Sequence, residues 1–184
     1  MLEEHTDGPA FNDESIKQLL GEEATGYKNV YKSFAGNFLN ISAEVGQFLY
    51  ICARARQAKR IVEFGTSFGI STIYLATALK DGGGRLRTEL EATKTQCARD
   101  NHETASLADL VEIRVGDALE ALRDGVGGPV DLVLLDGAFG LCRPALELRE
   151  PHLRPGAPVI AENAVEQSTG YLGHVRDPRN GTAP

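Results

Sequence analysis

Long apolar runs and an excess of positive charge are both missing from this sequence. None of its apolar segments approaches the roughly 20 residues that a membrane-spanning helix needs. The acidic, polar segment 1–9 lacks the basic and apolar regions of a signal peptide. The formal net charge of −7 gives no positive field to hold nucleic acid or an anionic membrane. We therefore expect a cytoplasmic protein with no nucleic-acid partner and no membrane partner.

Cysteine pairs and a dinucleotide-binding fingerprint are missing too. Cys52, Cys97 and Cys142 are an odd number, lie far apart and form no C-x-x-C motif, which is typical of reduced thiols. The turn 65–69 has the pattern G-x-x-x-G, because Ser67 occupies the place of the middle glycine in G-x-G-x-x-G. This spacing disfavours a nicotinamide-dependent oxidoreductase.

The turn 65–69 connects a short apolar run, 61–64, to a segment with helical spacing of its apolar residues, 70–79. This order predicts a buried strand, a glycine turn and a helix, which is the first half of a βαβ unit. Gly65 and Gly69 can adopt positive φ and let a ligand approach the backbone. Glu63 would repel a pyrophosphate but suits a ligand with an amino group or a positive centre. The alternative is that the two glycines only make a tight connection.

The same alternation continues along the chain. The predicted strands are 61–64, 85–90, 111–115, 130–136 and 158–161, and the predicted helices are 13–23, 42–56, 70–79, 93–106, 118–122 and 144–153. This pattern predicts an α/β fold, a Rossmann-like doubly wound parallel sheet with strand order 3-2-1-4-5. The length of 184 residues and 42% hydrophobic content suit one α/β domain, 37–184, after a helical, partly disordered cap, 1–36. The tail from residue 167 on has little to bury.

The helix 42–56 has clear end signals. Ser42 is a typical N-cap residue, and Arg54 and Arg56 in the last turn match the helix dipole. Its predicted apolar face carries Val45, Phe48, Leu49, Cys52 and Ala55.

Acidic residues stand at or near the carboxyl end of every predicted strand. They are Glu63, Glu89, Asp117, Asp136 and Glu162. In a parallel sheet these ends share one edge, where open α/β folds bind their ligands. Five acids on one edge would repel one another unless a cation or hydroxyl groups lay among them. An acid at the tip of the second strand, Glu89, is also placed to bind ribose hydroxyls, although an exposed glutamate beside Glu91 is an equally good interpretation.

Five segments together resemble one known family. They are Ile61-Val-Glu-Phe-Gly-Thr-Ser-Phe-Gly-Ile-Ser71, Thr88-Glu-Leu-Glu91, Val115-Gly-Asp-Ala118, Leu134-Leu-Asp-Gly137 and Val159-Ile-Ala-Glu-Asn163. Their order and spacing over residues 37–177 resemble class I S-adenosylmethionine-dependent methyltransferases. The chain is most similar to the catechol O-methyltransferase-like branch of small-molecule O-methyltransferases from bacteria.

The resemblance implies a role for each matching position. The methionine end of S-adenosylmethionine would be surrounded by Ile41, Ser42, Glu63, Gly65, Thr66, Ser67 and Ser71. Glu89 would hold the ribose hydroxyls, and Asp117 and Ala118 would flank the adenine. A divalent ion, usually magnesium in this family, would be bound by Asp136, Glu162 and Asn163, with Asp136 both catalytic and next to the cofactor. Such an ion holds two vicinal oxygens of a catechol-like acceptor and lowers a hydroxyl pKa.

Three departures from the family pattern matter for function. Phe139 stands where the family has a lysine that can act as general base, and Glu162 stands where it has aspartate. The family also continues past a segment like 175–181 into an antiparallel hairpin of two strands, whereas this sequence stops at Pro184. An open sheet edge favours association, so we expect a homodimer.

Two functions from different classes follow. The first is a metal-assisted S-adenosylmethionine-dependent O-methyltransferase acting on a small phenolic or hydroxylated metabolite. The second is a methyltransferase-like protein that binds the cofactor without methyl transfer, as a natural-product enzyme of another kind or as a binding or assembly protein. Phe139 and the missing hairpin favour the second, and the intact cofactor positions favour the first.

Overall fold

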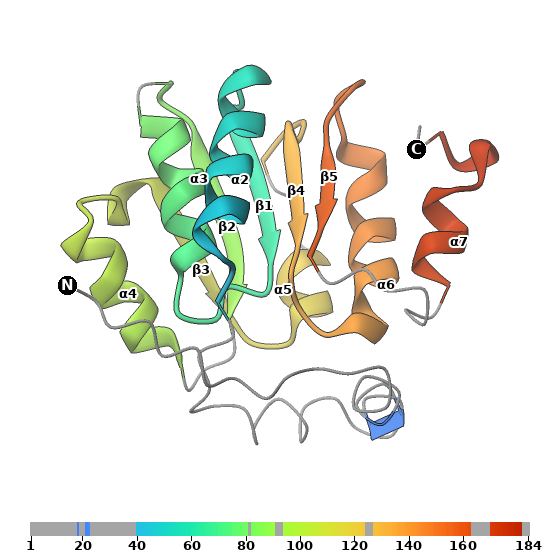
Figure 1. Ribbon diagram of the computed structural model, residues 1–184, viewed down its shortest axis with the longest axis horizontal. Coiled ribbons are helices and arrows are strands. Elements are labelled where there is room, and N and C mark those ends of the chain that lie inside the picture. The colour runs from blue at the N-terminus through green and yellow to red at the C-terminus, as the bar shows by residue number, and fades with distance from the viewer. Residues whose placement is uncertain are drawn as a thin grey trace.

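The fold is a five-stranded parallel sheet with helices on both faces. The computed structural model describes residues 18, 21, 22, 40–80, 82–90, 94–123, 127–162 and 170–181. The strands are β1 (Arg60–Phe64), β2 (Arg85–Leu90), β3 (Val111–Val115), β4 (Leu132–Leu135) and β5 (Val159–Ala161). They lie in the order β3-β2-β1-β4-β5, and all four pairings are parallel (Figure 1). The predicted α/β class and strand order are confirmed.

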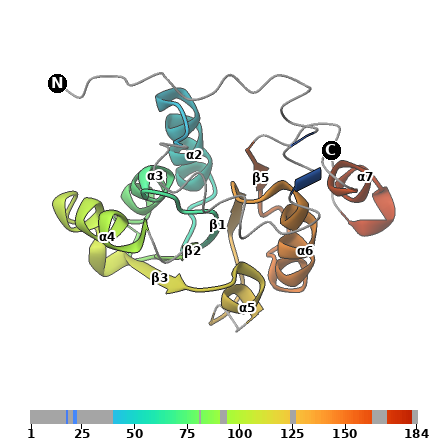
Figure 2. The same cartoon turned by 90° about the horizontal axis from the view of Figure 1, so that it is seen from below.

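Helices cover the sheet in two layers. The α-helices are α2 (Ala43–Ala55), α3 (Ile70–Lys80), α4 (Thr95–Thr104), α5 (Ala118–Arg123), α6 (Phe139–Arg149) and α7 (Tyr171–Val175). Short 3-10 helices are η2 (Ala108–Leu110), η3 (Glu150–His152) and η4 (Pro178–Asn180). Figure 2 shows α2, α3 and α4 on one face of the sheet and α5 and α6 on the other. Within the part of the chain that the structure describes, no helix is long and apolar enough to cross a bilayer.

Successive side chains of the central strands point to opposite faces of the sheet and pack into two separate hydrophobic cores. Ile61, Leu132 and Leu134 pack against α2 and α3, whereas Val62 and Val133 pack against α5 and α6. Strands that are buried on both faces have near-continuous apolar sequences, which is why 61–64 and 132–135 were recognisable as strands. This arrangement fixes β1 and β4 as the rigid centre of the sheet.

The amino ends of β1 and β4 are joined by one buried acid. Asp131 Oδ2 accepts hydrogen bonds from the backbone N–H groups of Lys59 (2.8 Å) and Arg60 (2.9 Å). Its Oδ1 lies 3.2 Å from a guanidinium nitrogen of Arg154. The side chain of Asp131 is 3% exposed, so this is a buried anchor with all of its charge matched.

Helix α2 confirms its predicted cap but not the whole of its predicted face. Ser42 Oγ accepts a hydrogen bond from Val45 N (3.3 Å). Leu49 is buried as expected, but Ala55 is exposed and Phe48 is 53% exposed. The predicted apolar face is confirmed at Val45, Leu49 and Cys52, which pack against the core, and is wrong at Phe48 and Ala55. Gly46 and Ala53 are buried as well, and a Cβ at Gly46 would overlap the ring of Tyr74. Phe48 follows Gly46 by two residues, about 200° around the helix, and so faces away from this contact.

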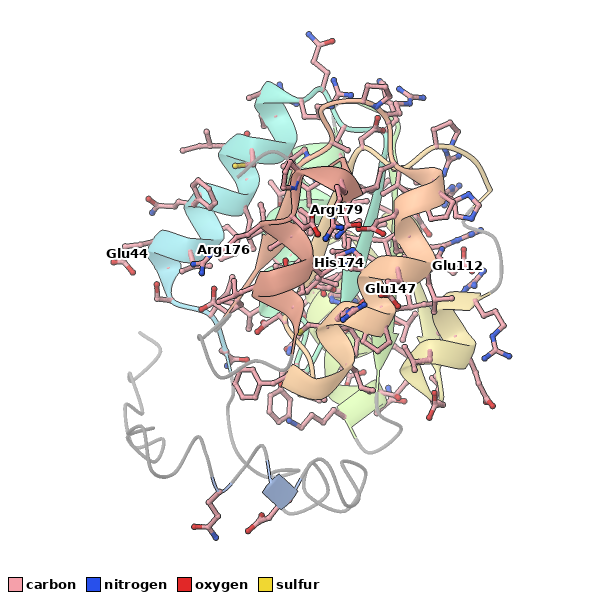
Figure 3. All side chains as sticks on the ribbon, turned by 90° about the vertical axis from the view of Figure 1, so that its right-hand side faces the viewer. Glu44, Glu112, Glu147, His174, Arg176 and Arg179 are labelled. Atoms are coloured by element: carbon pink, nitrogen blue, oxygen red, sulfur yellow. The ribbon has the colours of Figure 1, made fainter. Side chains whose placement is uncertain are left out.

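Two predictions near the C-terminus were wrong. Helix α6 begins at Phe139 rather than Pro144, and Pro144 lies inside it. Proline is favoured in a first helical turn, which makes it a misleading start signal here. The tail also buries more than expected, because Tyr171 on α7 is 4% exposed and belongs to the core under α6. Glu150 holds α7 in place through His174 Nε2, at 2.7 Å, and His174 also faces Glu147 (Figure 3).

The predicted cap at 1–36 lies outside the described residues, apart from the helical backbone at Gln18, Gly21 and Glu22. Its partition from an α/β domain at 37–184 stays a prediction.

Candidate functional site

The turn between β1 and α3 has an unusual backbone. Gly65, Ser67 and Gly69 all have positive φ, at 94°, 48° and 84°. A Cβ at Gly65 would overlap the backbone carbonyl oxygen of Asp136, so only glycine fits there. Residues 65–69 therefore pack directly on the chain that leaves β4. We call them the cofactor turn, after the role that the sequence leads us to expect.

Glu63 is completely buried at the base of this turn. Its carboxylate accepts hydrogen bonds from Ser71 Oγ (2.5 Å) and Thr72 Oγ1 (2.6 Å), both in the first turn of α3. Burial raises the pKa of Glu63, while hydrogen bonds from these two hydroxyls and from Thr66 lower it in part. No cation faces this carboxylate among the partners that the structure describes for it. A buried acid held only by neutral donors is well suited to a ligand that brings positive charge.

Asp136 and Glu162 lie at the carboxyl ends of β4 and β5. Asp136 N donates to Phe64 O (2.8 Å) and Glu162 N donates to Leu135 O (2.9 Å), so both follow directly from the paired strands. Burial raises the pKa of Asp136 to about 8, with further contributions from the charges of Glu162 and Glu63. The structure therefore brings three of the predicted acids together at the junction of β1, β4 and β5.

Three further predicted residues have clear structural contacts. Ile41 packs against the core between α2 and α3, and Thr66 is 2% exposed. Asp117 caps α5, since its Oδ1 accepts from Leu119 N (3.1 Å) and Glu120 N (3.4 Å). The cap gives Asp117 a structural role whether or not it borders a ligand.

Some predicted site residues lie partly or wholly outside the described residues. For Glu89 and Ala118 the backbone is described and the side chain is not, and Asn163 is not described at all. The backbone of Glu89 lies opposite Phe64 in the β1–β2 pairing, which places Glu89 at the same sheet edge as Glu63 and Asp136. In the described part of the chain, no three His, Cys, Asp or Glu side chains gather closely enough to hold a metal ion.

Phe139 lies three residues after Asp136, as the first residue of α6. It is half-buried and offers neither a proton acceptor nor a hydrogen-bond donor.

Sequence reasoning missed four side chains that support the site. Thr72 shares Glu63 with Ser71, and the cofactor turn is contacted by Asn101 and His102 from α4 and by Lys94 from the N-cap position of α4. Ser71-Thr72 at the start of a helix was a usable signal, because hydroxyls there often bond to nearby acceptors. The three α4 contacts had no local signal.

Comparison with known proteins gives a consistent result. A family model described as a methyltransferase domain matches residues 62–164. The catechol O-methyltransferase of Niastella koreensis is 31% identical over 94% of this chain and 78% of its own length. That of Mycobacterium tuberculosis is 36% identical over 68% of this chain, and the match spans 57% of that protein.

Solved structures agree in fold and in sequence. The O-methyltransferase TomG from Streptomyces achromogenes, involved in tomaymycin synthesis and solved in complex with SAM, is 35% identical with a TM-score of 0.66. That match covers 88% of this chain and 70% of TomG. The O-methyltransferase from Bacillus cereus, solved in complex with SAH, is 29% identical with a TM-score of 0.68. It covers 95% of this chain and 77% of that one. With the five-stranded order and the glycine turn, these matches show that the chain belongs to the class I S-adenosylmethionine-dependent methyltransferases, in their catechol O-methyltransferase-like branch.

Proposed function

We propose that this chain transfers the methyl group of S-adenosylmethionine to a hydroxyl of a small phenolic or hydroxylated metabolite. The observation that carries the proposal is the buried Glu63 carboxylate under the cofactor turn, next to Asp136 at the adjacent strand tip. Further support is that relatives carry the name catechol O-methyltransferase and that similar O-methyltransferases were solved with SAM or SAH.

The hydroxyls of Ser71 and Thr72 hold the Glu63 carboxylate in place by hydrogen bonds. Each donates its only proton to the carboxylate. The lone pairs of Ser71 Oγ can then accept from the methionine ammonium, whereas Thr72 is 0% exposed and only supports Glu63. Ile41, Ser42, Gly65, Thr66 and Ser67 form the remaining wall around the methionine end. In this proposal Glu89 binds the ribose diol, and Asp117 and Ala118 flank the adenine.

The residue types expected at the ends of β4 and β5 suit a hard divalent cation such as Mg²⁺. The charges of Glu162 and Glu63 help to raise the pKa of Asp136 to about 8, and a bound cation would relieve that repulsion. Asp136, Glu162 and Asn163 would supply two carboxylates and an amide oxygen, the ligand types that magnesium prefers. A cation held by these residues would supply Lewis-acid chemistry, lowering the pKa of an acceptor hydroxyl.

Glu162 makes this set less regular than one with aspartate. Its extra methylene moves the carboxylate by about 1 Å, and magnesium tolerates poor geometry badly. We therefore expect the cation to bind weakly without the acceptor.

Phe139 favours a second function, that of a cofactor-binding protein without methyl transfer. A positioned general base typically contributes about 10²–10⁴-fold to a rate, and Phe139 cannot act as one. In this case cofactor binding would persist without any effect of magnesium.

The proposed assembly is a homodimer. Both edge strands, β3 and β5, pair with one neighbour each in the described part of the sheet, and Phe48 and Ile51 expose an apolar patch on α2. Light scattering at high concentration checks this, and a monodisperse monomer would contradict it.

Calorimetric titration with S-adenosylmethionine, with and without MgCl₂, tests the function directly. The wild type should bind, and Glu89→Ala should weaken binding by about 1.5–3 kcal/mol, the usual range for hydrogen bonds to a charged group. The matched control is Glu103→Ala, an exposed acid on α4, which should bind as the wild type does. Binding of NAD in place of S-adenosylmethionine would overturn the proposal.

Activity separates the two candidate functions. Magnesium-dependent methylation of any member of a catechol panel supports the first. Tight cofactor binding that magnesium does not change, with no methylated product, supports the second.

A further inference from the structure

The cofactor turn adopts a conformation that its own residues do not favour. A positive φ at Ser67, which is not a glycine, costs about 1–2 kcal/mol, and the internal backbone bond described for the turn is Gly69 N to Thr66 O at 2.8 Å. Such backbone persists only where surrounding groups hold it. The neighbouring elements therefore decide how much of the time the turn is ready for a ligand.

Helix α4 and its N-cap residue contact three successive residues of this turn. Lys94 Nζ lies 3.3 Å from Ser67 Oγ and 4.8 Å from the centre of the Phe68 ring. Asn101 Nδ2 donates to the backbone oxygen of Phe68 at 2.9 Å. His102 packs so closely that a Cβ at Gly69 would overlap its Nε2.

Two of the side chains that contact the turn are polar and yet buried. Lys94 is 8% exposed and His102 is 1% exposed. Burial lowers the pKa of His102, so its ring is neutral and compatible with the positive end of α3, which starts at Ile70. Figure 2 places α4 beside α3, on the face of the sheet from which it can reach the turn.

We propose that α4 sets the conformation of the cofactor turn, and that Asn101 and His102 are positioning residues for S-adenosylmethionine. The inference rests on the proposed function, because it assigns to the same site residues that hold the turn without contacting the cofactor. Binding needs the turn in its strained form, so the measured Kd equals the intrinsic Kd divided by the fraction of molecules in that form. Removing an α4 contact lowers this fraction without touching the cofactor.

The first experiment compares Asn101→Ala with Gln96→Ala. Gln96 lies on the exposed side of α4, where it bonds to Asp100 rather than to the turn. Asn101→Ala should raise the Kd and the KM for S-adenosylmethionine about five- to tenfold, the effect of one neutral hydrogen bond. The rate at saturating cofactor should stay within about twofold, because the turn is then fully ordered. Gln96→Ala should change neither quantity.

The second experiment uses the close approach of Gly69 and His102. Gly69→Ala should weaken cofactor binding, and Gly69→Ala/His102→Ala should restore part of it by removing the overlap, although the strain of a positive φ remains. The control, Gly69→Ala/Gln96→Ala, should restore none.

The outcomes separate the two levels of the proposal. If the wild type does not bind S-adenosylmethionine, the proposed function and this inference both fail. If the wild type binds it and Asn101→Ala loses thermal stability but keeps the wild-type Kd in its folded fraction, only the positioning role is overturned. Additive effects in the Gly69/His102 cycle would likewise overturn it for His102.

Discussion

Glu63 and Asp131 are buried carboxylates at opposite ends of the same central strand pair, and their charges are matched in different ways. Asp131, at the amino ends, accepts from two backbone N–H groups and pairs with Arg154. Glu63, at the carboxyl ends, is held by two hydroxyls and lies within charge range of Asp136 and not of a described cation.

This difference suggests that Asp131 contributes to the stability of the fold and Glu63 to ligand binding. Asp131 has a cation of its own, so its site is complete in the folded chain. The Glu63 site holds acids without a described cation, so ionising them costs free energy in the folded chain, and a positive ligand or ion would remove that cost. Substitutions at both ends of the strand pair can therefore test whether the amino ends of the strands (the amino edge) stabilise the fold and the carboxyl ends (the carboxyl edge) bind the ligand.

The largest effect is expected for Asp131→Ala. It removes the acceptor of two buried backbone N–H groups at about 1–3 kcal/mol each, so unfolding should become easier by about 2–6 kcal/mol. Urea denaturation measures this, with the exposed Asp109→Ala as control, expected within about 0.5 kcal/mol of the wild type. Cofactor affinity of the folded fraction should not change, and a large loss of affinity would contradict the separation.

Glu63→Gln should show the opposite pattern. Removing a buried charge whose pKa is raised by burial should leave stability equal or higher, while the lost charge should weaken S-adenosylmethionine binding by about 1.5–3 kcal/mol. Thermal unfolding and calorimetry on one preparation measure both. A variant that unfolds more easily and still binds normally would show that Glu63 is only a structural acid.

Phe139→Lys should raise turnover with catechols at least about tenfold, and the activity should still depend on magnesium. The first turn of α6 disfavours a cation, which lowers the lysine pKa and makes the amine a better base at neutral pH. Phe139→Met is the control for loss of the ring. Brisk wild-type activity that the lysine does not increase would mean that no base is needed at this position.

Asp136→Asn should give the smallest effect and a distinctive pH dependence. Burial and two neighbouring carboxylates raise the pKa of Asp136 from 3.8 to about 8, so folding favours the protonated form. Below pH 3.8 the group is protonated in both states and costs nothing. Between pH 3.8 and 8 the unfolded chain loses a proton that the folded chain retains, so folded stability falls as pH rises.

At pH 9 the Asp136→Asn variant should therefore be at least about 1 kcal/mol more stable than the wild type, or about 2–4 °C in Tm. At pH 4 the two should nearly coincide. MgCl₂ should raise the Tm of the wild type at pH 8 more than that of the variant. A stability difference that is the same at both pH values would refute this explanation.

The fold could be predicted well where a segment is apolar enough to be buried on both sides. Strands β1 and β4 were recognisable because their side chains pack into both cores. Strands β2 and β3 match their predicted bounds although neither is apolar throughout. Helix α7 was missed because a five-residue helix with one buried residue, Tyr171, has no detectable period. The start of α6 was missed because Pro144 lies inside the helix.

Some residues of the candidate site could likewise be predicted from the sequence, and others could not. Glu63, Asp136 and Glu162 could be placed together from the sequence, because the carboxyl ends of parallel strands share an edge. Asn101 and His102 could not, because their contacts with Phe68 and Gly69 depend on how α4 docks, and Asn101 lies 33 residues from its partner. Local pattern sets the elements, but not the angle at which a helix meets a turn.

The anchor at Asp131 also bears on the order of folding. Lys59 and Asp131 are 72 residues apart, whereas β1 reaches β2 through a single helical crossover. Closing the longer loop costs more chain entropy, so the β1–β2 unit can form before β4 docks. Asp131→Ala should then act mainly on the unfolding limb of a chevron plot, because the contact it removes is absent from an early transition state. On this view the amino edge sets how long the native sheet survives rather than how fast it is made.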